Sequence, residues 1–132
     1  VICDKERRKA NEIASMTIIG DVKDMDVVLV DDLCDTAGTL SKAAKLIKDS
    51  GARSVRAVCT HPVLSGKAYE NIENSVLEEL IVCDTIPMKQ TSPKIRVLSV
   101  APLISKAIRN IHEHGSVSSL FKLDNSFQPN LI

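Results

Sequence analysis

The sequence has few aromatic residues, no net charge and no apolar run long enough to span a membrane. Its 132 residues include one tyrosine, two phenylalanines and no tryptophan, so the core of the expected single domain must be aliphatic. Seventeen basic and seventeen acidic residues cancel, and a neutral chain has no long-range field that attracts nucleic acid or anionic membranes. We therefore expect neither nucleic acid nor a membrane as a partner.

Several patterns that indicate a particular chemistry are also missing. The four cysteines include no C-x-x-C pair, which favours free thiols in a reducing cytosol over disulfides or a zinc site. Neither the P-loop pattern G-x-x-x-x-G-K-[ST] nor the dinucleotide pattern G-x-G-x-x-G occurs. The chain begins at Val1 without a methionine or a signal peptide, so we expect a cytoplasmic protein and a fragment of a longer chain.

Apolar runs alternate with helical patterns, which predicts an α/β fold. The run 26–31 is continuously apolar between carboxylates, as in a strand covered on both faces. Further strands are expected at 16–19, 55–60, 80–83 and 95–100, and helices at about 40–50, 66–74 and 104–114, with Gly51 and Gly115 closing the first and third. Short connections between these elements predict a mostly parallel sheet with right-handed crossovers and helices on both faces.

The most informative segment is VVLVDDLCDTAGT, residues 27–39, because polar residues directly follow a buried strand. Ligands of parallel sheets bind beyond the carboxyl ends of the strands, and we expect this segment to lie there after a central strand. Asp31 and Asp32 point to opposite sides of the strand's end. Carboxylates accept hydrogen bonds from vicinal hydroxyls, as on a ribose, and anchor Mg²⁺ through water.

The DTAGT turn that follows is suited to bind an anion. Small residues before a helix leave backbone N–H groups for a ligand, and the helix dipole favours negative charge there. Gly38 allows the backbone to approach a phosphate closely. Together with the acidic pair, the turn predicts a sugar-phosphate site. The structural alternative is that Asp35 and Thr39 merely cap the helix.

Four stretches resemble the ribose-phosphate pyrophosphokinase family, which makes phosphoribosyl pyrophosphate. The apolar run with two acidic residues and D-T-x-G-T is similar to the phosphoribosyl-pyrophosphate signature of the phosphoribosyltransferase-like fold. DKERRKAN (4–11), CTHPVLSGKAYENI (59–72) and SVSSLF (116–121) narrow the resemblance to this family. The match implies one C-terminal domain, residues 1–121, of a two-domain enzyme, followed by a tail at 122–132 without an assigned role.

The resemblance also implies a reaction in nucleotide biosynthesis. Enzymes of this family move the pyrophosphoryl group of ATP to the C1 hydroxyl of ribose 5-phosphate with magnesium, which gives phosphoribosyl pyrophosphate and AMP. Asp31 and Asp32 then hold the ribose hydroxyls, directly or through Mg²⁺. Lys5 and Arg7 lie in a mobile loop segment, residues 1–12, that closes over the triphosphate. The 5-phosphate is held by the loop residues Asp35, Thr36, Ala37, Gly38 and Thr39.

Regulation and assembly are implied in the same way. Ser116, Ser118 and Phe121 match S-x-S-x-x-F, which in one class of the family helps form an allosteric site for phosphate or ADP at subunit contacts. The family forms hexamers, so a homo-oligomer is expected. The structural alternative is a polar tail with Phe121 tucked into the core. Because the adenine contacts and other ATP contacts lie in the family's N-terminal half, we expect this chain alone to bind ribose 5-phosphate but to be inactive.

Three other functions fit parts of the sequence. A receiver-type signalling domain also ends a strand with an acidic pair, and Asp84 and Lys89 follow a later strand, but it has no need of DTAGT. A nucleobase phosphoribosyltransferase shares the sugar-phosphate loop but commonly stacks its base on aromatic side chains, and this chain has only Tyr69, Phe121 and Phe127. A non-catalytic regulatory relative keeps the fold, although the intact acidic pair and basic residues argue against lost chemistry.

Overall fold

The computed structural model describes the backbone of residues 2–9 and 12–121 and the side chains of residues 20–121. The described residues form two compact units that divide between Leu98 and Ser99. The first unit begins with an antiparallel hairpin of β1 (Ile2–Lys9) and β2 (Glu12–Ile19). The sequence predicted a strand at 16–19, which β2 confirms, but it indicated no strand in the charged stretch that forms β1.

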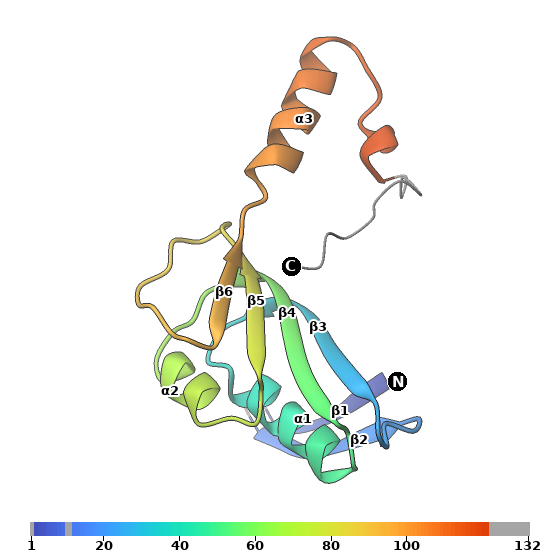
Figure 1. Ribbon diagram of the computed structural model, residues 1–132, viewed down its shortest axis with the longest axis vertical. Helices are drawn as coiled ribbons and strands as arrows, with labels where there is room; N and C mark the ends of the chain where they lie inside the picture. Colours follow the sequence, from blue (N-terminus) through green and yellow to red (C-terminus); the bar gives the residue numbers. More distant parts are fainter. Residues whose placement is uncertain (1, 10–11, 122–132) are drawn as a thin grey trace. The chain divides into compact units, whose positions relative to one another are not determined.

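Four parallel strands form the main sheet, in the order β3–β4–β5–β6 (Figure 1). Their bounds are β3 (Asp26–Cys34), β4 (Ser54–Pro62), β5 (Glu79–Cys83) and β6 (Ile95–Leu98). Helix α1 (Gly38–Asp49) connects β3 to β4, and α2 (Ala68–Glu73) connects β4 to β5. The parallel sheet with intervening helices confirms the predicted α/β class.

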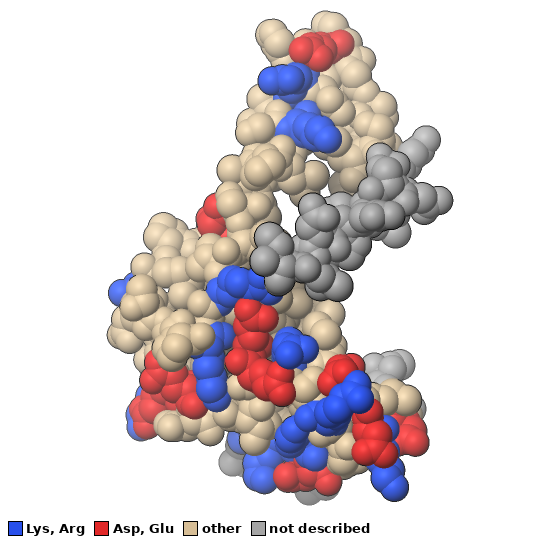
Figure 2. All heavy atoms as spheres, viewed as in Figure 1, with Lys and Arg blue, Asp and Glu red and all other residues tan. Residues whose placement is uncertain are grey.

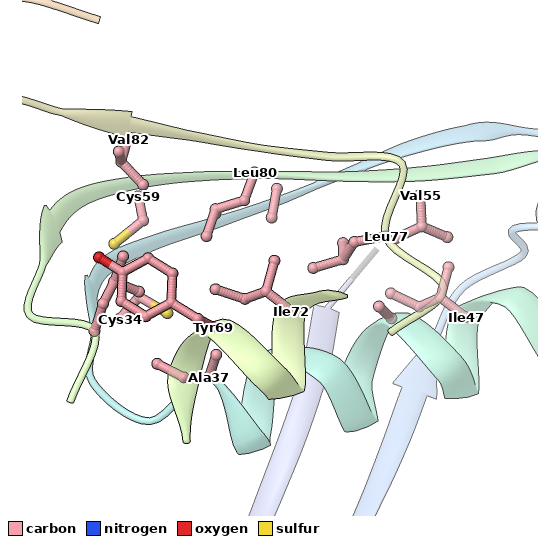
Figure 3. Close-up of a cluster of buried hydrophobic side chains, with 14 of the residues drawn as sticks. Cys34, Ala37, Ile47, Val55, Cys59, Tyr69, Ile72, Leu77, Leu80 and Val82 are labelled. Carbon is pink, nitrogen blue, oxygen red and sulfur yellow. The ribbon is translucent and has the colours of Figure 1, made fainter. Parts of the chain in front are cut away.

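The hydrophobic core lies between the sheet and both of these helices (Figure 3). The two helices contact each other as well as the same core cluster, so they share one face of the sheet. Apart from Tyr69 and two cysteines the cluster is aliphatic, as the shortage of aromatic residues requires. Its fully buried side chains include Ala44, Ile47, Val55, Ala57, Ile72, Leu77, Leu80 and Val82.

Strand β3 differs from its prediction in two respects. It lies at an edge of the four-stranded sheet rather than in the centre, among the described residues. Val28 and Val30 are 54% and 80% exposed, so the expectation of a strand covered on both faces is wrong for β3. The physical reason is that α1 and α2 pack on the opposite face, where Val27 and Leu29 meet the core. Only that face of the strand is buried.

Helix α1 ends as the sequence predicts. Gly51 has φ of 97°, the left-handed conformation that a glycine adopts without steric cost, and its N–H donates to Lys48 O at 3.0 Å. The chain then turns through Ala52 into β4. A single glycine thus fixes where the first crossover returns to the sheet.

Charged side chains of both signs are interspersed on the face of the molecule in Figure 2. Among the described side chains, three ion pairs join strands or strand ends: Arg53 with Asp26, Arg56 with Glu78, and Arg96 with Glu79. All involve exposed or half-exposed side chains, where an ion pair contributes about 0–1 kcal/mol. This pattern agrees with the cancelling charges of the sequence and offers no surface of a single sign on that face.

The second unit contains α3 (Ala101–His112) and a 3₁₀ turn, η1 (Ser118–Phe121). Pro102 lies in the first turn of α3, where a missing N–H costs no intrahelical bond. The helix ends near the expected Gly115, but the left-handed residue is His114, with φ of 54°. Among the described residues, no helix has the length and hydrophobicity needed to cross a membrane.

Candidate functional site

A cleft of about 330 Å³ opens at the carboxyl end of β3, where the sequence predicts a binding site. Its size lies at the lower end of the range for small-molecule sites. Among the residues whose side chains the structure describes, those that line the cleft all belong to the segment 31–40: Asp31, Asp32, Leu33, Cys34, Asp35, Thr36, Ala37, Thr39 and Leu40. Helix α1 begins within this segment, at Gly38.

The acidic pair lies within β3 rather than at its end. The strand continues to Cys34, three residues beyond the expected end, because it pairs with β4 as far as Pro62. Asp31 and Asp32 are both exposed and both line the cleft. The Asp32 N–H donates to Asp31 Oδ1 at 2.9 Å, which orients the first carboxylate. Two neighbouring carboxylates that line one cleft can accept hydrogen bonds from a polyhydroxyl ligand.

The turn into α1 is built around Ala37. This residue is the N-cap of the helix, in the left-handed conformation with φ of 58° and ψ of 4°, and no side chain caps the helix there. The alternative that Asp35 and Thr39 merely cap the helix is therefore wrong. Ser41 N–H donates to Ala37 O at 2.9 Å and closes the first turn. The start of the helix faces the cleft with its positive dipole end, which favours an anion there.

The unusual backbone conformation lies at Ala37, for which the sequence predicted no special conformation. Gly38, which the sequence suggested for close approach of the backbone to a phosphate, is the first helical residue, and its φ lies outside the left-handed region. Its importance is the missing side chain. A Cβ added there would meet only Thr36 Oγ1, at 3.7 Å, so the protein itself leaves this space open.

Sequence reasoning missed two residues that contact the loop. Ser65 Oγ donates a short hydrogen bond to Asp35 Oδ1, and Asn71 Nδ2 donates to Thr36 O at 2.9 Å. Both belong to the stretch CTHPVLSGKAYENI, which carried a resemblance but no role. That stretch was the only signal in the sequence that could have drawn attention to them.

Cys34 is part of the cleft but is not suited to be a nucleophile. Its side chain is almost completely buried, and this burial raises the pKa of the thiol to about 12. Burial likewise raises the pKa of the nearby Cys59 thiol. Both remain protonated at neutral pH, and both belong to the core cluster. The interpretation of these cysteines as small core residues is confirmed, and both are free thiols.

The acidic pair fits a magnesium ion only in company with a ligand. The described residues contain no group of three or more His, Cys, Asp or Glu side chains that could hold a metal ion. Mg²⁺, however, commonly uses one or two protein carboxylates and completes its shell with water and substrate phosphates. Asp31 and Asp32 line one cleft and supply such a pair. A phosphorylated ligand would have to supply the remaining oxygens.

The predicted catalytic residues lie elsewhere in the first unit. Lys5 and Arg7 are on β1, where Lys5 pairs with Met16 and Arg7 with Ile13 across the hairpin. Their side chains lie outside the described part, so their role stays a prediction. The same holds for the mobility of residues 1–12.

The predicted allosteric residues lie in the second unit. Ser116 O accepts hydrogen bonds from Asn110 Nδ2 at 2.9 Å and Ser119 Oγ at 2.7 Å. Ser118 and Phe121 bound η1. Within this unit Phe121 is 84% exposed, and the alternative that it packs against the core of the first unit stays a prediction. The tail at 122–132 lies outside the described residues.

Comparisons with known proteins agree on one family. The family model described as phosphoribosyl synthetase-associated domain matches residues 5–122. The chain is 60% identical over 121 residues to a ribose-phosphate pyrophosphokinase of Campylobacter jejuni, which covers 92% of the chain and 39% of that relative. It is 57% identical, with the same coverage, to the enzyme of that name from Wolinella succinogenes. The chain thus spans about two fifths of the length of these curated relatives.

A solved structure supports the same relationship. The fold is similar to that of phosphoribosylpyrophosphate synthetase from Mycobacterium smegmatis, with a TM-score of 0.73 and 38% sequence identity. The similarity covers 76% of this chain and 35% of that protein. Most of this fold therefore occurs in a solved synthetase.

Proposed function

The chain belongs to the phosphoribosyl synthetase-associated domain family, and we propose that it is the C-terminal, ribose 5-phosphate-binding domain of a ribose-phosphate pyrophosphokinase. One observation carries the proposal. The described lining of the cleft comes from residues 31–40, where an acidic pair adjoins a loop that leads into a helix. The acidic pair can accept hydrogen bonds from a diol, and the loop at the helix start can bind a phosphate ester. A sugar phosphate contains both of these groups.

In this proposal each part of the cleft contacts one part of the substrate. The loop and the first turn of α1 hold the 5-phosphate by backbone N–H groups and threonine hydroxyls, since the helix dipole favours a dianion there. Asp31 and Asp32 hold the ribose hydroxyls, either directly or through Mg²⁺. The phosphate-binding residues are Asp35, Thr36, Ala37, Gly38 and Thr39.

The reaction that we propose is that of the full-length enzyme. The C1 hydroxyl of ribose 5-phosphate attacks the β-phosphorus of ATP, the bond to the α-phosphate oxygen breaks, and the products are phosphoribosyl pyrophosphate and AMP. Lys5 and Arg7 supply positive charge to the phosphoryl oxygens as the transferred group carries more charge. Bound magnesium supplies further charge neutralisation. The remaining ATP contacts come from outside this chain, so the chain alone is inactive.

Regulation and assembly extend this proposal. Ser116, Ser118 and Phe121 contribute to an effector site for ADP or phosphate in a homo-oligomeric enzyme. The exposure of Phe121 supports a role at a contact between subunits, because burial of an 84% exposed aromatic side chain by a neighbouring subunit would be favourable.

Calorimetric titration tests the proposed binding. The chain is titrated separately with ribose 5-phosphate, with ribose and with magnesium ATP. We expect ribose 5-phosphate to bind, ribose to bind at least tenfold more weakly, and magnesium ATP to give no saturable heat. Absence of ribose 5-phosphate binding would contradict the assignment of this cleft, and equal affinity for ribose would contradict the phosphate loop.

Replacement of Thr39 by valine tests the loop itself. Thr39 lines the cleft, and valine keeps its shape while it removes the hydroxyl. Loss of one hydrogen bond to a charged phosphate predicts a dissociation constant about tenfold higher. Thr91→Val, at an exposed position outside the cleft, is the matched control and should leave the affinity unchanged. Equal affinities of both variants would reject a role for Thr39.

A further inference from the structure

The segment 64–71 holds the candidate phosphate loop through three consecutive backbone carbonyls. These carbonyls belong to residues 34–36, and each accepts a hydrogen bond from the same distant segment. The donors are Leu64 N–H to Cys34 O at 3.1 Å, Ser65 N–H to Asp35 O at 3.0 Å, and Asn71 Nδ2 to Thr36 O at 2.9 Å. No residue of the described segment 64–71 lines the cleft, so this segment supports the loop from outside it.

These contacts decide which way the peptide groups of the loop point. In a trans peptide the C=O and the N–H lie on opposite sides of the bond. When the carbonyls of Cys34 and Asp35 are held toward the supporting segment, the N–H groups of Asp35 and Thr36 point away from it. The hydrogen bonds therefore orient donors before any ligand arrives.

Ser65 also positions the carboxylate of Asp35. Its hydroxyl donates to Asp35 Oδ1, so the carboxylate of Asp35 has a partner in the supporting segment. A carboxylate directed at a bound phosphate would repel it. With the carboxylate bound to Ser65, Asp35 can contribute its N–H to an anion site.

The backbone on both sides of this contact is held in a disfavoured conformation. Ala37 and Leu64 are not glycines, yet their φ values are 58° and 45°, in the left-handed region. Both side chains are buried in the same core cluster. Such conformations persist only where the surrounding structure fixes them, and they concentrate at functional sites. The loop is thus built into shape by its surroundings.

Asn71 joins three elements at this point. It lies on α2, which Tyr69 and Ile72 anchor in the core. Its side-chain amide holds Thr36 O, and its own carbonyl accepts a hydrogen bond from Ser41 Oγ at 3.1 Å, in the first turn of α1. Asn71 therefore fixes the loop and the start of the helix relative to each other.

We propose that Asn71 and Ser65 are positioning residues that preorganise the loop at 34–37 for a phosphate ester. The inference rests on the proposed function, since it assigns the support of that same site. Preorganisation raises affinity because the loop need not be ordered when the ligand binds. Neither residue lines the cleft, so both act through the loop.

The test uses four variants of the chain with ribose 5-phosphate and inorganic phosphate as probes. We expect Asn71→Ala and Ser65→Ala to raise the dissociation constants for both probes by about five- to tenfold, the effect of one hydrogen bond. Ser65→Thr keeps the hydroxyl and should restore most of the affinity. Asn74→Ala removes the same amide from the exposed C-cap of the same helix and should have no effect.

Further readouts separate positioning from general stability. Melting temperatures measured for all variants show whether an affinity loss results from unfolding. Ser65→Ala is the milder substitution and still tests the inference if Asn71→Ala lowers the fraction of folded protein. In the full-length enzyme both variants should raise the Michaelis constant for ribose 5-phosphate and leave that for ATP unchanged. If Asn71→Ala and Ser65→Ala both bind the probes with wild-type affinity, this inference is overturned and the proposed function is not affected. An equal loss in Asn74→Ala would overturn it too, whereas a wild-type chain that binds neither probe would overturn the proposed function with it.

Discussion

Replacement of Gly38 by alanine should weaken ligand binding without any loss of stability. Gly38 is the first residue of α1, its φ lies outside the left-handed region, and an added Cβ would meet only Thr36 Oγ1 at 3.7 Å, an ordinary contact. Alanine loses less backbone entropy on folding than glycine, so the free energy of unfolding should rise by about 0.5 kcal/mol. The added methyl group, however, would occupy the space at the N-terminus of α1 where the phosphate is proposed to lie. We therefore expect the affinity for ribose 5-phosphate to fall at least tenfold, or about 1.4 kcal/mol.

Gly51→Ala is the opposing control, because it is distant from the cleft and strains the backbone. Gly51 has φ of 97°, and an added Cβ would lie 3.4 Å from Lys23 Cγ. A side chain in the left-handed region costs about 1–2 kcal/mol, partly offset by the reduced entropy of the unfolded chain, so a net loss of about 1 kcal/mol is expected. Its affinity for ribose 5-phosphate should equal that of the wild type.

Urea denaturation and calorimetric titration of the same preparations separate the two effects. The expected pattern is opposite in the two variants: Gly38→Ala is stable and binds poorly, and Gly51→Ala is less stable and binds well. Wild-type affinity in Gly38→Ala would refute the reasoning that a phosphate approaches the backbone at this point. A stability loss in Gly38→Ala of more than about 1 kcal/mol would instead show that the loop cannot accept a methyl group.

Two further predictions concern catalysis and pH. In the full-length enzyme, Lys5→Ala should lower kcat far more than it raises the Michaelis constant for ATP, because the proposed charge acts in the transition state; a change in the Michaelis constant alone rejects that role. Hydrogen bonds from Arg53, with Nε at 2.9 Å, and from Ser54 Oγ at 2.6 Å hold the pKa of Asp26 well below its ordinary value of 3.8. The stabilisation from this lowered pKa is therefore complete above pH 3.8 and is lost as the pH falls below that value. Urea denaturation should show that Asp26→Asn is less stable than the wild type at pH 7 and closer to it at pH 3. A stability difference that does not change with pH contradicts this prediction.

Local patterns in the sequence were sufficient for most elements of the fold. The spacing of Leu40, Ala44 and Ile47 depends only on neighbours along the chain, and α1 contains all three. Strand β1 was not predicted because its charged residues have no local preference for a strand, and its pairing with β2 is what defines it. The edge position of β3 likewise depends on strand order, which an apolar run does not contain.

The candidate site was predictable in composition but not in backbone geometry. The motif predicted a site at 31–39, and the described lining of the cleft falls at 31–40. It indicated Gly38 for close approach of the backbone to a phosphate, but it predicted no unusual conformation at the neighbouring residue. Ala37 adopts that left-handed conformation, and this residue is 5% exposed and packs in the core. Burial of this side chain compensates for the cost of the left-handed backbone conformation. This compensation depends on tertiary packing, which the motif does not describe.

The support of the loop could not be predicted because it depends on contacts between distant residues. Ser65 is 30 positions from Asp35, and Asn71 is 35 positions from Thr36. A motif read along the chain identifies the donors of an anion site, but donors whose orientation is not fixed must be ordered when the ligand binds, at a cost in affinity. Here the orientation comes from α2 and the turn before it, which the parallel sheet brings beside the loop because β3 and β4 are neighbours. The proposed site therefore consists of two adjacent strand-to-helix connections, and the signature in the sequence describes only the first of them.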